Sequence, residues 1–188
     1  MEFLYYGKKF DGLNPSGVTF QRQTNENSCW AACIANARSV LFGKDDIIDI
    51  DIYNKNHDGF HFIAVHENNI VEYIAFVSEM TGVQPVPKEK WDLPDALEGV
   101  CKALSHGYPC MIGLNNPSGG VGHDVLALAW GGPFGTHFLV YDPQENVTSP
   151  PGSIASAIQV AMQGGLTVLD YGFLQNYGRW AIPLRRRI

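Results

Sequence analysis

The sequence predicts an α+β domain in which an N-terminal central helix packs on a largely antiparallel β-sheet. Segments with apolar residues at helical spacing come first in the chain, and short runs of aliphatic and aromatic residues between Gly, Pro and Asn turns follow from residue 110. This separation of helices from strands is typical of α+β proteins. The chain has 188 residues, which suits one core, so we expect a single domain over residues 1–188.

Three helices are expected in the first half of the chain. The first is capped by Asn27 or Ser28 and ends at the glycine that follows its last apolar residues. The second covers residues 68–80. The third runs from a cap at Asp92 to Gly107.

Five strands are expected in the second half. They cover residues 110–114, 123–130, 137–142, 166–171 and 179–184. A further helix, rich in small residues, is expected around residues 154–162. Residues 1–22 favour short strands and turns, and the acidic-aliphatic run over residues 45–52 suits a short edge strand or a variable loop.

The charge balance argues against nucleic acid as a partner. The net charge is −6, and the one basic run, three arginines at residues 185–187, is interpreted as a solvated tail. The N-terminus lacks the features of a secretory signal. The sequence contains no run of about 18 apolar residues, which a membrane-spanning helix would need. We therefore expect no membrane partner, and a protein that works in the cytoplasm or leaves by a signal-independent route.

Four cysteines in a chain of this length are too few for a disulfide scaffold, so reduced thiols are expected. Cys29 and Cys33 lie one helical turn apart, which is not the spacing of a zinc knuckle. Cys29 is at the start of the first expected helix, where the helix dipole and a nearby imidazolium would favour the reactive thiolate. By itself, however, a single cysteine is more often a small buried apolar residue than a nucleophile.

Gln23 lies six residues before Cys29. At that position a side-chain amide could donate to an oxyanion together with the backbone N–H of Cys29. Alone, Gln23 is also explained as a polar loop residue.

These residues resemble the motifs of the papain-like cysteine peptidase superfamily, which places an oxyanion Gln six residues before Cys-Trp at the start of its central helix. The resemblance extends to residues 103–113, which look like the helix, Gly-x-Pro and strand of the bacterial branch of that fold. It also includes the Gly-His strand at His123 and the strand that ends in Asp-Pro at Asp142. It covers residues 20–42 and 100–145, and within the superfamily the motifs look most like bacteriocin-leader peptidases and papain-fold effector proteases.

The resemblance implies a papain-like fold, with a central helix on an antiparallel sheet or half-barrel, and a role for each matched residue. Cys29 is implied as the nucleophile, His123 as its base, Asp142 as the orienting acid and Gln23 as the oxyanion donor. Such a set suits acyl transfer through a thioester, so we expect a peptidase or amidase acting on a peptide or protein. No cofactor and no metal are expected, and an inhibitor or immunity protein is a further candidate partner.

The chain contains other histidines that could serve in place of His123. His137 lies five residues before Asp142 on one expected strand, so strand alternation places the two on opposite faces and favours a structural role for His137. A metal site could be assembled from His57, His61 and His66. Their spacing fits no known metal motif, so solvated loop histidines are the preferred interpretation.

Two alternatives to hydrolysis stay open from the sequence. The same residues could pass the acyl group to an amine or thiol, as transglutaminase-like enzymes do. Alternatively, the chain could keep the fold as a binding module without turnover, in which case Cys29 would show no enhanced reactivity.

Overall fold

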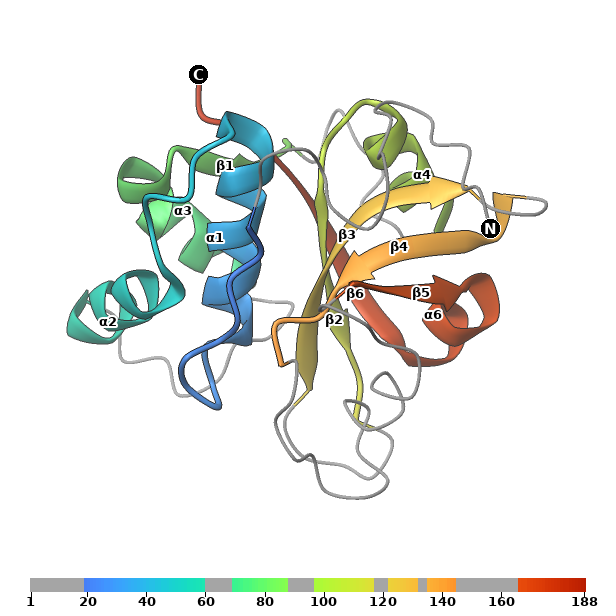
Figure 1. Cartoon of the computed structure of the whole chain (residues 1–188), viewed down its shortest axis with the longest axis horizontal. Helices are drawn as coiled ribbons and strands as arrows, with labels where there is room; N and C mark the ends of the chain where they lie inside the picture. The colour runs from blue at the N-terminus through green and yellow to red at the C-terminus, as the bar shows by residue number, and fades with distance from the viewer. Residues whose placement is uncertain (1–18, 60–68, 88–96, 117–121, 132–134, 145–165) are drawn as a thin grey trace.

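The computed structural model describes residues 19–59, 69–87, 97–116, 122–131, 135–144 and 166–188. In these ranges the chain is α+β, as the sequence predicts (Figure 1). The helices are α1 (Cys29–Phe42), α2 (Asp49–Gly59), α3 (Ile70–Thr81), α4 (Leu97–Ser105) and α6 (Tyr171–Tyr177). The strands are β1 (Val83–Pro85), β2 (Cys110–Leu114), β3 (His123–Gly131), β4 (His137–Tyr141), β5 (Leu166–Asp170) and β6 (Gly178–Arg186).

The six strands form one open antiparallel sheet in the order β1-β6-β2-β3-β4-β5. β6 comes last in the chain and lies between β1 and β2. Leu126 of β3 pairs with Tyr141 of β4, so the first residues of β3 lie beside the end of β4. This register brings together two chain segments that carry candidate site residues.

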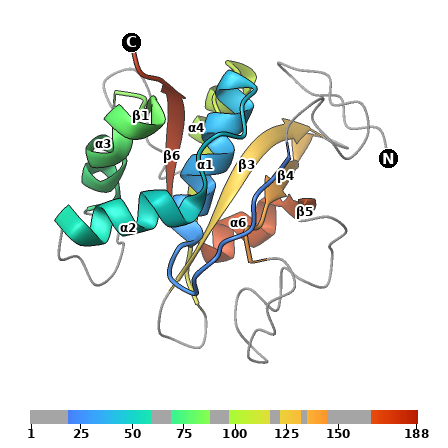
Figure 2. The same cartoon turned by 60° about the vertical axis from the view of Figure 1, so that its left-hand side comes forward.

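Both faces of the sheet are covered by helices. Figure 1 shows α1, α2 and α3 on the left of the strands and α4 and α6 on the right, and the turned view of Figure 2 shows α1 running along the sheet. Residues that alternate along each strand divide between two cores. Leu126 of β3 and Leu139 of β4 belong to the core under α1, whereas Val125 and Val140 belong to the core under α4 and α6.

α1 packs against β2, β3 and β6 through small, buried side chains. Ala31, Ala32, Cys33 and Ala35 are fully buried. Small side chains allow a helix to approach a neighbouring layer closely. The helix ends at Gly43, whose φ of 67° is the left-handed conformation that glycine adopts without strain. The N-terminal helix α1 therefore packs on the antiparallel sheet, as predicted.

Most of the predicted helices and strands that fall in the described residues are confirmed, but residues 45–52, expected as a short edge strand or a variable loop, are irregular only up to Ile48 and then enter a helix. Residues 44–48 have no regular structure and α2 begins at Asp49. Two acidic residues in the first turn, Asp49 and Asp51, suit the positive end of a helix dipole. Ile52 is fully buried, which gives the helix an inner side. Alternation of Ile and Asp over so few residues fits a strand and a helix start equally well.

Two short elements, β1 and α6, were not predicted from the sequence. The predicted cap at Asp92, the helix at 154–162 and residues 1–18 lie outside the described residues. The arginines at 185–187 do not form a free tail, because β6 extends to Arg186 and pairs with β1. The Arg186 guanidinium also donates to the carbonyl of Leu41 and lies 4.9 Å from the centre of the Phe42 ring. Among the described residues, no helix is long and apolar enough to cross a membrane.

Gly113 of β2 provides a test of the packing between the neighbouring strands β2 and β6. A Cβ at this position would overlap the indole ring of Trp180, the residue of β6 that pairs with Gly113. We expect Gly113→Ala to lower the free energy of unfolding by about 1–3 kcal/mol, because an added methyl group overpacks the site. Urea unfolding measures the change. Adding Trp180→Ala should relieve the overlap, so the double variant should lose less stability than the sum of the two single variants; additive losses would contradict this packing.

Candidate active site

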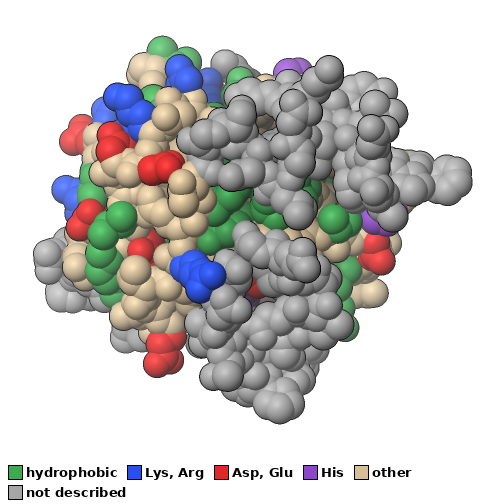
Figure 3. All heavy atoms as spheres, in the orientation of Figure 1, with side chains coloured by type: hydrophobic (Ala, Val, Ile, Leu, Met, Phe, Trp, Pro, Cys, Tyr) green, Lys and Arg blue, Asp and Glu red, His purple; other side chains and the backbone are tan. Residues whose placement is uncertain are grey.

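Three of the four predicted site residues come together at one end of the sheet. Cys29 is the first residue of α1, His123 is the first residue of β3, and Asp142 directly follows β4. Figure 3 shows hydrophobic side chains between the helices on the left and the strands on the right, where the two layers meet. The three residues are almost fully buried, with exposed fractions of 8% for Cys29, 6% for His123 and 0% for Asp142.

A short hydrogen bond joins His123 to Asp142. Nε2 of His123 lies 2.6 Å from Oδ1 of Asp142. The same carboxylate oxygen accepts a hydrogen bond from the backbone N–H of Gln144 at 2.8 Å. Burial lowers the pKa of His123, but the Asp142 carboxylate and the neighbouring Cys29 outweigh it and raise the pKa to about 10. The imidazolium form of His123 is therefore favoured.

The thiol of Cys29 interacts with the other side of the same imidazole. Since Nε2 of His123 is bonded to Asp142, Nδ1 is the ring nitrogen left for the sulfur. Burial and the Asp124 carboxylate raise the pKa of Cys29, whereas the hydrogen bond with His123 and its charge lower it. The start of α1 also favours the thiolate of Cys29, because the backbone N–H groups of the first helical residues have no acceptor within the helix and carry a partial positive charge. A thiol, an imidazole and a carboxylate thus lie next to one another.

Asp124 is a site residue that the sequence analysis missed. Oδ2 of Asp124 lies 3.6 Å from Sγ of Cys29, and the carboxyl group is 7% exposed. Burial raises the pKa of Asp124 to about 6, against the opposing effects of His123 and Cys29. The available signal was its place in β3, two residues before Leu126 on the face that packs under α1. A carboxyl group in such an apolar stripe is unusual.

Gln23 lies close to the other three residues, but its side chain is held within its own loop. The backbone N–H of Gln23 donates to the carbonyl of Pro143 at 2.9 Å, which ties this loop to the residue after Asp142. The side-chain Nε2 donates to the carbonyl of Asn25 at 3.0 Å and to that of Glu26 at 3.3 Å. In this arrangement both amide hydrogens of Gln23 point to loop carbonyls.

Asp49 anchors the loop between Gln23 and Cys29. Its Oδ2 accepts hydrogen bonds from the backbone N–H of Thr24 at 2.7 Å, the hydroxyl of Thr24 at 3.1 Å and the hydroxyl of Ser28 at 2.7 Å. Asp49 is 1% exposed. Ser28 precedes α1 without capping it through its side chain, because its hydroxyl is used by Asp49 and Asn25. Sequence analysis gave no signal for this contact between α2 and the loop.

A second buried polar residue fixes the start of the same segment. The Asn36 side chain in α1 donates to the carbonyl of Gln21 at 2.9 Å and accepts from the N–H of Gln21 at 2.8 Å. Asn36 is fully buried. Together with Asp49, Asn36 fixes the position of the segment that leads into Cys29.

The other histidines and cysteines that the structure describes are not part of the hydrogen-bonded group formed by Cys29, His123, Asp124 and Asp142. His137 is half-buried, and its Nδ1 contacts the hydroxyl of Thr136 at 3.2 Å. His57 lies in α2, and His61 and His66 lie outside the described residues. Within the described part of the chain, no group of three or more His, Cys, Asp or Glu residues could hold a metal ion. All four cysteines are free thiols, and burial raises the pKa of Cys33, Cys101 and Cys110.

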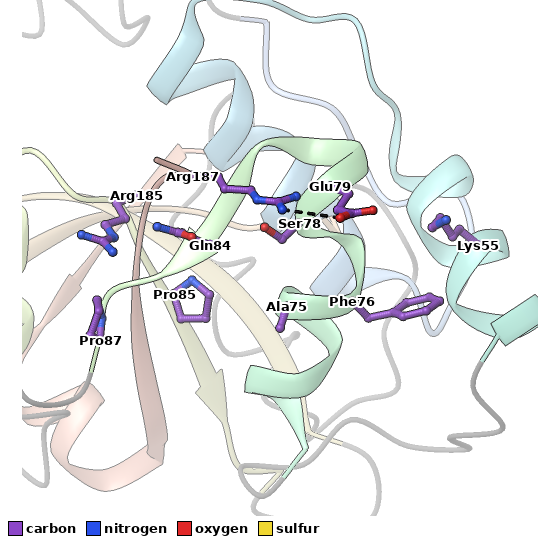
Figure 4. A pocket seen from close by; sticks show the side chains of 10 residues that line it. All are labelled: Lys55, Ala75, Phe76, Ser78, Glu79, Gln84, Pro85, Pro87, Arg185 and Arg187. Atoms are coloured by element: carbon purple, nitrogen blue, oxygen red, sulfur yellow. Dashed lines mark hydrogen bonds and ion pairs between the residues drawn. The ribbon is translucent and has the colours of Figure 1, made fainter.

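A hollow of about 550 Å³ lies away from Cys29, between α2, α3, β1 and β6 (Figure 4). Arg187 and Glu79 on its wall form an ion pair at 3.4 Å. Its lining residues are Lys55, Ala75, Phe76, Ser78, Glu79, Gln84, Pro85, Pro87, Arg185 and Arg187. None of the candidate site residues is among them.

No protein-family model matches the sequence, and no curated protein is similar to it. The functional interpretation of Cys29, His123 and Asp142 therefore depends on their geometry and chemistry.

The His123–Asp142 pair predicts a stability that falls as the pH rises. The folded pKa of His123 is about 10, against about 6.5 for an unperturbed histidine. The stabilisation is therefore complete below about pH 6.5 and is lost as the pH rises through 10. Between pH 7 and 8.5, before thiols ionise, we expect the free energy of unfolding to fall by up to about 1.4 kcal/mol per pH unit.

Urea unfolding at several pH values measures this slope. His123→Gln should remove it, whereas His106→Gln, which replaces an exposed histidine at the end of α4, should keep it. A slope that is the same in wild type and His123→Gln would contradict the ion pair.

Proposed function

We propose that the protein is a cysteine hydrolase that cleaves peptide or amide bonds, with Cys29 as nucleophile, His123 as base and Asp142 as orienting acid. The observation that carries this proposal is the placement of one buried imidazole between the Asp142 carboxylate, at 2.6 Å, and the Cys29 thiol. A nucleophile within reach of a base, and a base oriented by a third group, is the arrangement needed for covalent acyl transfer.

The first half of the proposed reaction forms a thioester. Cys29 reacts as the thiolate, after its proton has passed to solvent water, beside the His123 imidazolium. The sulfur attacks the carbonyl carbon of the scissile bond, whose π electrons move to the oxygen. The tetrahedral intermediate then collapses as the amine leaves with a proton from His123. A carbon–sulfur bond has formed and a carbon–nitrogen bond has broken.

Water completes the reaction at the same groups. His123 removes a proton from a water molecule, the hydroxide attacks the thioester, and the sulfur leaves as the carboxylic acid is released. Asp142 keeps the imidazole in one orientation and stabilises its charged form in both halves. Its complete burial strengthens this effect, because few water dipoles compete with the hydrogen bond.

The oxyanion would be stabilised at the start of α1. The backbone N–H of Cys29 is one donor, and the Gln23 amide is the second candidate. The longer of its two hydrogen bonds, 3.3 Å to the carbonyl of Glu26, is the one that we expect the oxyanion to replace. Asp49 and the Gln23 contact with Pro143 hold the loop in position for this exchange.

The proposal extends to the papain-like fold and a peptide or protein substrate. In support, the nucleophile begins a central helix, the base and the acid lie on neighbouring antiparallel strands, and the four residues follow in the order Gln23, Cys29, His123, Asp142. An amide in an extended peptide suits a site at the junction of the two layers, where the helix start and the strand ends meet.

A peptidyl epoxide tests the nucleophile directly. Wild-type protein should be alkylated at Cys29, as shown by mass mapping, and Cys29→Ala should lose both the label and activity on a peptide library by about 10³-fold or more. Cys33→Ala is the matched control, because Cys33 is buried one turn further along α1 and should not be needed. Equal labelling of several cysteines, or activity in Cys29→Ala, would disprove this assignment.

Gln23→Ala tests the second oxyanion donor. Loss of one such donor costs about 10²- to 10³-fold in kcat with little change in KM, because the contact is made in the transition state. Steady-state kinetics on a cleaved library peptide measure the effect. Gln175→Ala removes an exposed glutamine of α6 and serves as the control. If kcat is unchanged in Gln23→Ala, the oxyanion is bound without this side chain.

A further inference from the structure

A second carboxyl group touches the sulfur of Cys29. The thiol donates a hydrogen bond to Oδ2 of Asp124, with the two atoms 3.6 Å apart. Both side chains are more than nine-tenths buried, with exposed fractions of 8% for Cys29 and 7% for Asp124. A carboxylate and a thiolate at this distance repel each other, and burial weakens the screening by water. The reaction proposed above does not use this carboxyl group.

Strand alternation directs Asp124 toward α1. It precedes Leu126 and Leu128 by two and four residues, and both leucines belong to the core under α1. The residue opposite Asp124 on β2 is Gly113, which has no side chain to donate a hydrogen bond. The carboxyl group is therefore presented to the start of α1, where the nucleophile lies.

The titratable groups that surround Asp124 leave its charge largely unbalanced. Cys29 and Cys33 face it from α1, and His123 precedes it on β3. The positive charge of His123 is already paired with the Asp142 carboxylate, whose Oδ1 lies 2.6 Å from Nε2 of the ring. Within the described ranges, no ion pair joins Asp124 to a lysine or an arginine.

The direction of the pKa shifts agrees with this geometry. Burial raises the pKa of Asp124 to about 6, so the group is a carboxylate at neutral pH. After burial, the Asp124 carboxylate is the largest influence that raises the pKa of Cys29. His123 acts in the opposite direction on the same sulfur.

We propose that Asp124 is a fourth charged member of the reacting group, whose carboxylate holds Cys29 in the thiol form at neutral pH and so restrains the nucleophile until that charge is neutralised. The inference rests on the proposed role of Cys29. In the restrained state the proton stays on the sulfur and is shared with Oδ2 of Asp124. Removing the charge of Asp124 allows the sulfur to release that proton to solvent water, so that a thiolate forms beside the His123 imidazolium.

Alkylation of Cys29 by iodoacetamide, followed from pH 5 to 10, tests the restraint without requiring turnover. Fragment mass spectra separate Cys29 from Cys33. In Asp124→Asn we expect the apparent pKa of Cys29 to fall by about one unit or more, and the alkylation rate at pH 7 to rise about tenfold or more. Asp51→Asn removes the same charge at an exposed position of α2 and should match wild type.

Each possible alkylation rate of Asp124→Asn either supports or overturns the inference. Faster alkylation in Asp124→Asn supports the inference even if no peptide substrate is ever cleaved, a result that would count against the proposed function alone. An unchanged rate overturns the inference, although cleavage lost in Cys29→Ala would leave the proposed function in place. A slower rate also overturns it, because Asp124 would then be helping to remove the thiol proton.

A second variant and a measurement on the wild type keep the test decisive if Asp124→Asn misfolds. Asp124→Ser removes the charge with a smaller side chain and should give the same change in rate. In wild type, the ultraviolet absorbance of the thiolate, taken as the difference from Cys29→Ser, should appear only above the ordinary thiol range of about pH 8.5. A thiolate already present at pH 6 in wild type would overturn the restraint.

Discussion

The docking of α1 on the sheet is the constraint on which the rest of the site depends. The small side chains of its packing face let the helix lie close to β3, and its first residue then meets the first residue of that strand. A shift of α1 by one turn would move Cys29 by about 5.4 Å, beyond hydrogen-bond reach of His123. The close packing of an interior makes such a shift costly, so the helix and strand hold the sulfur and the imidazole in register.

Two carboxyl groups act on this pair in opposite directions. Asp142 lies beyond the imidazole and favours its charged form, which supports ionisation of the thiol. Asp124 lies beside the sulfur and opposes that ionisation. Both groups are buried, so their charges are poorly screened and their positions decide their effects. The protonation state of Cys29 therefore depends on the opposing effects of two carboxyl groups, and not on His123 alone.

The loop before α1 is held by side chains from two helices. Asn36 of α1 bonds both backbone groups of Gln21, and Asp49 of α2 bonds Thr24 and Ser28. A loop fixed at both ends can present Gln23 and the Cys29 N–H with little loss of entropy on binding. α2, which forms no part of the sheet, thereby contributes to the site.

Local patterns in the sequence determined the helices α1 and α3 and the central strands, because periodicity and glycine stops are read within a few residues. The candidates Gln23, Cys29, His123 and Asp142 came from the resemblance of their motifs to a known superfamily. Local patterns did not indicate the helix that begins at Asp49, because alternating Ile and Asp suits a strand or a helix start. Only the tertiary structure decided the parts played by Asp49 and Asp124. The effect of a carboxyl group depends on which groups it meets and how much water is excluded, and distant segments set both.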